Sequence, residues 1–127
     1  MEDSYATRSQ RFESFSVSVQ ISNAGVSRVD AFPKEERYSL TDQIRRSSRS
    51  VPSNIAEGFR KRRYPKMFIS KFADADGESS ETQVWLDFAR DCGYLGAGPY
   101  AELTAGYEEV GKMLGSMIAH PEKFRAL

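Results

Sequence analysis

The sequence predicts an all-α protein, an antiparallel up-and-down four-helix bundle. Apolar residues recur three or four positions apart through residues 38–59, 65–91 and 99–117, which is the spacing of one face of a helix. Pro65 opens the segment after the first link, and glycines lie within the second link, at residues 92–98. Helices joined by short links pack as antiparallel neighbours.

Residues 12–30 hold the first predicted helix, although their pattern is ambiguous. A strand would explain the alternation of apolar and polar residues through Phe15, Val17, Val19 and Ile21. A helix would explain the wider spacing of Phe12, Phe15, Val19, Val26 and Val29. No second segment offers this strand a partner, so we predict a helix that ends near Pro33.

Residues 38–59 form the second predicted helix, with Pro52 inside it. Its apolar stripe consists of Leu40, Ile44, Val51, Ile55 and Phe59. A proline in a helix interior costs about 3 kcal/mol. The stripe nevertheless keeps the same phase on both sides of the proline, so we predict one helix that is kinked at Pro52.

The third predicted helix covers residues 65–91, with Pro65 in its first turn and Gly93 as its C-terminal stop. Gly77 in its interior suggests a close helix crossing. The fourth helix opens at Pro99, ends near His120 and has a regular stripe of Leu103, Tyr107, Val110, Leu114 and Met117. In the fourth helix, small surfaces at Gly106, Gly111 and Gly115 would let another helix approach.

Length and composition fit one folded domain, since the chain has 127 residues of which 39% are hydrophobic. We expect a disordered N-terminus at residues 1–11, the bundle domain at 12–120 and a C-terminal tail at 121–127. No apolar run is long enough for a membrane span or a signal sequence, so we expect a cytoplasmic protein without a membrane partner.

Positive charge is concentrated in one region, although the net charge is zero. Residues 45–66 contain eight basic residues and one acid, whereas residues 74–127 contain ten acids and four bases. The basic residues are Arg45, Arg46, Arg49, Arg60, Lys61, Arg62, Arg63 and Lys66. Guanidinium groups match phosphate oxygens, which favours nucleic-acid binding. The alternative is that these side chains pair with acids of the same or an adjacent subunit.

The run "SVPSNIAEG" at residues 50–58 is the most specific motif. We interpret Pro52, Ser53, Asn54, Glu57 and Gly58 as a structural motif that shapes the helix for the bundle and the subunit interface. A pocket at the kink is the functional alternative.

Catalytic and metal chemistry lack the side chains that they require. His120 and Cys92 are the chain's one histidine and one cysteine, so the sequence offers no nucleophile–base pair and no usual zinc or di-iron ligand set. We therefore expect no enzyme activity, metal or cofactor, and we interpret Cys92 as a small buried residue.

The runs "FPKEERYSLTDQIRRSSRSVPSNIAEGFRKR" and "WLDFARDCGYL" resemble the four-helix-bundle family named for proteins encoded in intervening sequences of bacterial large-subunit ribosomal RNA. This family includes the accessory variability protein of diversity-generating retroelements, and the resemblance covers residues 32–117. It implies a ring-like homopentamer, and it does not imply catalysis. For the retroelement branch it also implies a basic surface that binds nucleic acid and a reverse transcriptase partner.

Residues and resemblance together predict a non-enzymatic, oligomeric accessory protein that contacts RNA or DNA phosphates through a basic helix face. The alternative is a structural homo-oligomeric assembly protein whose arginines pair with acids in or between subunits.

Overall fold

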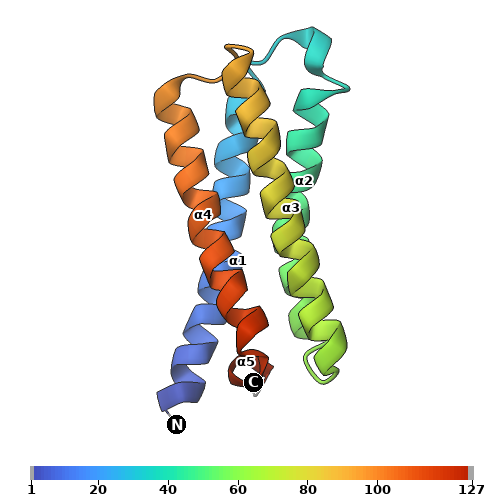
Figure 1. Cartoon of the computed structure of the whole chain (residues 1–127), viewed down its shortest axis with the longest axis vertical. Coiled ribbons are helices and arrows are strands. Elements are labelled where there is room, and N and C mark those ends of the chain that lie inside the picture. The colour runs from blue at the N-terminus through green and yellow to red at the C-terminus, as the bar shows by residue number, and fades with distance from the viewer. Residues whose placement is uncertain (1, 126–127) are drawn as a thin grey trace.

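Four long helices and two short ones make up the computed structural model, which describes residues 2–125 and the side chains of residues 13–125. The elements are α1 (Glu2–Val29), η1 (Lys34–Glu36), α2 (Leu40–Arg60), α3 (Pro65–Asp91), α4 (Ala97–Ala119) and α5 (Pro121–Arg125). The long helices run alternately up and down in one bundle (Figure 1). This confirms the predicted four-helix bundle.

Residues 15–21 lie inside α1, so the helix prediction is confirmed, and the described chain contains no strand. The face that α1 buries differs in part from the predicted one, although Val29 is buried as its spacing predicts. Phe15 is 41% exposed, whereas Ser14, Ser18 and Ser22 are buried. The serines lie four residues apart and share the inner face with Ile21, Gly25 and Val29, which explains why the apolar residues of this segment give no clear helical stripe.

The predicted stripes of the later helices form the core. Ile44, Val51 and Ile55 of α2 are fully buried. All five stripe residues of α4 are buried as well. In α3, Trp85 is only partly buried. The buried residues of this helix are Phe68, Phe72, Ala75, Ser79, Thr82, Leu86 and Ala89.

Hydroxyl groups form a polar layer within this core. Ser22 Oγ on α1 donates to Ser48 Oγ on α2 at 3.2 Å, and the hydroxyls of Ser47 and Thr82 bond at 2.8 Å between α2 and α3. The hydroxyl of Tyr107 is buried nearby in the core, and it makes no hydrogen bond of normal geometry within the described residues, although the Ser48 hydroxyl is close enough to act on its pKa. Burial raises the pKa of this hydroxyl.

Helix α2 continues through Pro52 without a break, as its unbroken stripe predicts. Helix α3 also begins at the predicted Pro65. It ends with Gly93 at a φ of 77°, and Gly93 N–H donates to Arg90 O while Tyr94 N–H donates to Ala89 O. This hydrogen-bond pair is the Schellman arrangement, in which glycine accepts the left-handed conformation without strain.

The glycines of α3 and α4 include a close helix approach at Gly106 and several open surfaces. A Cβ added to Gly106 would lie 2.4 Å from Ile21 Cδ1, so α1 and α4 touch there. No atom lies within 4 Å of a Cβ added at Gly77, Gly111 or Gly115. The predicted close crossing at Gly77 is therefore wrong within this chain, because α3 turns that position to the surface.

The backbone of residues 2–11 is helical, and their side chains lie outside the described residues. At the other end, α5 packs Phe124 into the core. Neither observation tests the predicted domain boundaries at residues 11 and 120, which stay predictions.

No helix in the described chain is long and apolar enough to cross a membrane.

Candidate nucleic-acid interface

The eight predicted cationic residues lie in two groups. Arg45, Arg46 and Arg49 belong to the first half of α2, and Arg60 to the end of that helix. Lys61, Arg62 and Arg63 form the link to α3, and Lys66 belongs to the first turn of α3. The link lies at the end of the bundle that also holds α5 (Figure 1).

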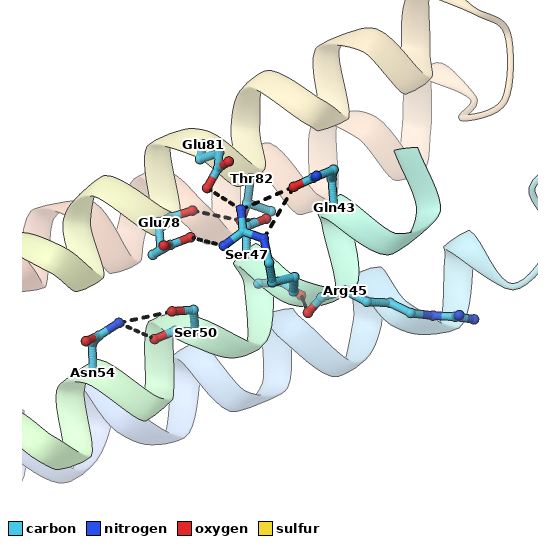
Figure 2. Close-up of polar contacts among 10 residues, drawn as sticks. Gln43, Arg45, Ser47, Ser50, Asn54, Glu78, Glu81 and Thr82 are labelled. Atoms are coloured by element: carbon cyan, nitrogen blue, oxygen red, sulfur yellow. Dashed lines mark hydrogen bonds and ion pairs between the residues drawn. The ribbon is translucent and has the colours of Figure 1, made fainter. Parts of the chain in front are cut away.

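Two arginines of the first group pair with acids of the same chain. Arg45 forms an ion pair with Asp30 at the end of α1. Arg46 Nη2 contacts Glu81 Oε2 at 2.7 Å, and Arg46 Nη1 contacts Glu78 Oε2 at 3.3 Å. Arg46 also donates to Gln43 Oε1 at 3.2 Å and 3.3 Å. Its acceptors Gln43, Glu78 and Glu81 are labelled in Figure 2.

The pKa shifts of this cluster follow from its contacts. The hydrogen bond with Glu81 raises the pKa of Arg46, and the same bond lowers the pKa of Glu81. Burial, together with the neighbouring Glu81, raises the pKa of Glu78 despite the attraction of Arg46. Arg46 thus holds α2 against α3. A phosphate could bind the Arg46 guanidinium only if these ion pairs and hydrogen bonds were broken.

The second group forms no ion pair within the described residues, although Lys61 attracts the Glu57 carboxylate and, after Lys71, helps to lower its pKa. Arg60, Lys61, Arg63 and Lys66 are exposed, and their side chains make no hydrogen bond or ion pair with the side chains described. Arg62 differs, because its Nη1 donates to the carbonyl of Phe59 at 3.0 Å. We call residues Arg60, Lys61, Arg62, Arg63 and Lys66 the basic turn.

Backbone hydrogen bonds close the basic turn tightly. Lys61 N–H donates to the carbonyls of Glu57 and Gly58, each at 3.1 Å. Tyr64 N–H donates to Lys61 O at 2.9 Å. The N-terminus of α3 follows directly, and its dipole adds positive potential to the four free cations.

Arg125 supports the same turn from α5, and sequence reasoning missed it. Its Nε donates to Arg62 O at 2.7 Å, and its Nη2 donates to Arg63 O at 3.3 Å. Phe124 beside it is 3% exposed and anchors α5 in the core. The available signal was Phe124 three residues after Pro121, which is the spacing of a short amphipathic helix.

An aromatic cluster packs beneath the basic turn. Phe59, Phe68 and Phe72 stack edge to face, with ring centroids 4.5 Å to 5.8 Å apart. These rings pack the end of α2 against the start of α3, so they hold together the two helix ends that flank the basic turn.

The "SVPSNIAEG" motif makes its described contacts within the bundle. Asn54 Nδ2 donates to the carbonyl and the hydroxyl of Ser50, at 2.9 Å and 3.0 Å (Figure 2). Glu57 pairs with Lys71 of α3 at 2.8 Å rather than with an arginine, and this hydrogen bond lowers the pKa of Glu57.

Other residues of the motif position α2. A Cβ at Gly58 would lie 3.1 Å from the ring of Phe72, so the glycine allows α3 to pack closely. Pro52 is partly buried and Ser53 is exposed. These contacts fit the structural interpretation of the motif, and its part in a subunit interface stays a prediction.

An apolar groove lies at the opposite end of the bundle from the basic turn. Its lining includes Tyr38, Leu40, Trp85, Phe88 and Cys92. Phe88 is 52% exposed. Cys92 is exposed, so the prediction of a buried cysteine is wrong, because the thiol follows the last turn of α3 instead of facing the core.

Within the described residues, no group of three or more His, Cys, Asp or Glu side chains is placed to hold a metal ion.

Comparison with known proteins adds two similarities. The family described as 23S rRNA-intervening sequence protein has a model that matches residues 12–116. A crystal structure of a protein of unknown function, from the S23 ribosomal protein family of Bacteroides thetaiotaomicron VPI-5482, is 27% identical in sequence with a TM-score of 0.70. The match covers 86% of this chain and 97% of that one. No curated protein matches the chain.

Proposed function

Because the chain belongs to the family of 23S rRNA-intervening sequence proteins, we propose that it is a non-enzymatic, oligomeric accessory protein that holds RNA or DNA phosphates on its basic turn. The observation that supports this is the exposure of Arg60, Lys61, Arg63 and Lys66, whose side chains form no ion pair with the part of the chain that the structure describes. Lys61 comes nearest to an exception, since it attracts the Glu57 carboxylate without forming an ion pair with it. A cation that is already free loses no protein contact when it binds a phosphate.

The proposal narrows the basic face that the sequence predicts. Arg45 is held by Asp30, the residue after α1, and Arg46 by two acids of α3, so we assign both arginines a structural role. Arg49 is exposed on α2 and would extend the phosphate track beyond the basic turn.

Salt dependence is the test of this proposal. Phosphate binding releases counterions, so the affinity for a generic RNA should fall steeply between about 50 and 200 mM salt. The variant Arg60→Gln, Lys61→Gln, Arg63→Gln and Lys66→Gln should flatten the logarithmic slope by about 3, given roughly 0.7 per phosphate contact on a single strand. Fluorescence anisotropy of a labelled RNA measures both slopes.

A matched control changes four exposed cations away from the basic turn: Arg28→Gln, Lys34→Gln, Arg37→Gln and Lys112→Gln. This control has the same net charge as the test variant. It therefore separates the effect of where the cations lie from the effect of lowering the total charge. Equal slopes in the two variants would show a diffuse attraction and contradict the assignment of the site. No binding of RNA or DNA at the lower salt would end the nucleic-acid proposal.

The second candidate function is a structural assembly protein, and the pairs of Arg45 and Arg46 favour it. In that case the remaining cations would meet acids of another subunit. The four-Gln variant of the basic turn would then lose assembly, without any change in an already negligible RNA affinity. A reverse transcriptase partner, which the resemblance implies for the retroelement branch, stays a prediction.

A further inference from the structure

Tyr64 stands within the basic turn with most of its side chain exposed. It is 61% exposed and lies between Arg63 and Pro65. Its ring and hydroxyl contact no other ring, cation or hydrogen-bond partner among the side chains described. A single exposed aromatic residue is ordinary on a protein surface, so exposure alone assigns no role to it. The unpaired cations on both sides distinguish this tyrosine.

The backbone holds Tyr64 in one place. Pro65 restricts the residue before it to extended conformations, and Tyr64 has φ −114° and ψ 99°. Its N–H donates to Lys61 O at 2.9 Å, and its carbonyl accepts from Phe68 N–H at 2.9 Å. Arg125 fixes the two preceding carbonyls. The ring therefore projects from an ordered turn, which lowers the entropy lost when a ligand binds.

We propose that the basic turn binds unpaired nucleotides, with one base stacked on the ring of Tyr64 and the adjoining phosphates held by Arg60, Lys61, Arg63 and Lys66. This inference rests on the proposed function and specifies its ligand as single-stranded nucleic acid. Every base has a π-face, so such a site is tolerant of sequence. A duplex keeps its base faces stacked inside and offers this surface only its phosphates.

The test compares one single strand and one duplex. The probes are a labelled, non-pairing RNA of about 12 nucleotides and an RNA duplex of the same length, within the usual site size of a single-strand binder. Tyr64→Ala should lower the affinity for the single strand about tenfold or more. It should leave the affinity for the duplex unchanged. Tyr64→Phe retains the ring and should bind both probes as the wild type does.

Tyr38→Ala is the matched control, because Tyr38 is 86% exposed at the other end of the bundle. It should leave both affinities unchanged. An equal loss for both probes in Tyr64→Ala would overturn the inference, because it would mean that the ring only shapes the turn. An unchanged single-strand affinity would overturn it as well.

The outcomes separate this inference from the proposed function. If the salt dependence of RNA affinity flattens in the four-Gln variant while Tyr64→Ala binds normally, the phosphate site is supported and the stacking site is contradicted. If the wild type binds neither probe, both the proposed function and the stacking site are contradicted.

Discussion

The buried hydroxyl of Tyr107 predicts an unusual response to a single substitution. Tyr107 is 1% exposed, and its hydroxyl makes no hydrogen bond of normal geometry within the described residues, although the Ser48 hydroxyl lies close to it. A buried polar group without a partner costs about 1 to 3 kcal/mol. Tyr107→Phe should therefore raise the free energy of unfolding by about 1 kcal/mol, as measured by urea denaturation.

Tyr94→Phe is the comparison for this experiment, since the hydroxyl of Tyr94 donates to Glu36 Oε2 at 3.0 Å. Removing a hydroxyl that has a partner should not stabilise the protein. A loss of stability in Tyr107→Phe would contradict the prediction and mean that the Tyr107 hydroxyl does have a partner.

The basic site could be predicted from the sequence only in part. The clustering of cations is visible in the sequence, because residues 45–66 are consecutive. Their division into paired and free groups is not visible. It depends on which acids the fold brings to Arg46, and Glu78 and Glu81 are more than thirty positions away. The same holds for Arg125, whose partners are 62 and 63 residues away.

At the scale of elements, the contact between α1 and α4 predicts opposite effects for two glycines of one helix. Gly106→Ala should destabilise the protein by about 1 kcal/mol or more, because the new methyl would meet Ile21 at 2.4 Å and 2.7 Å. Ile21 is β-branched, so it cannot readily turn away within a helix. Gly111→Ala meets nothing within 4 Å and should stabilise an isolated bundle by about 1 kcal/mol.

Thermal denaturation of the two variants measures this contrast. The melting temperature should fall for Gly106→Ala and rise for Gly111→Ala. A higher melting temperature for both variants would contradict the prediction. It would mean that α1 moves aside at little cost and that its close approach to α4 does not limit stability.

The elements differ in how well their sequence predicts them. Helices α2 and α4 have continuous apolar stripes, so both their existence and their buried faces follow from periodicity. For α1 only the helix follows, because Ser14, Ser18 and Ser22 turn inward, and serine is mostly an exposed residue type. A polar residue that faces a partner hydroxyl in the core is recognisable only once that partner is placed.

For the whole molecule, we predict a homo-oligomer with one apolar contact on α3. Val84 and Phe88 lie one helical turn apart and are 49% and 52% exposed, and a row of exposed apolar side chains marks an interaction surface. Light scattering should give a multiple of the 14.3 kDa chain mass, five-fold if the ring that the resemblance implies is correct. A monomer mass at micromolar concentration would contradict the prediction.

Phe88→Glu tests the position of that contact. It should reduce the oligomer mass and leave the helical circular-dichroism signal intact, because the side chain already faces solvent in one chain. An oligomer of unchanged mass would place the contact elsewhere on the bundle.

The exposed thiol of Cys92 gives the chain a single site for thiol-specific labelling. It is the one cysteine in the sequence, and it lies at the end of α3 while the basic turn lies at its start. A helix of 27 residues spans about 40 Å at 1.5 Å per residue. A maleimide dye on Cys92 would thus sit far from the basic turn. Energy transfer from this dye to one end or the other of a bound strand would report the direction in which the strand runs across the protein.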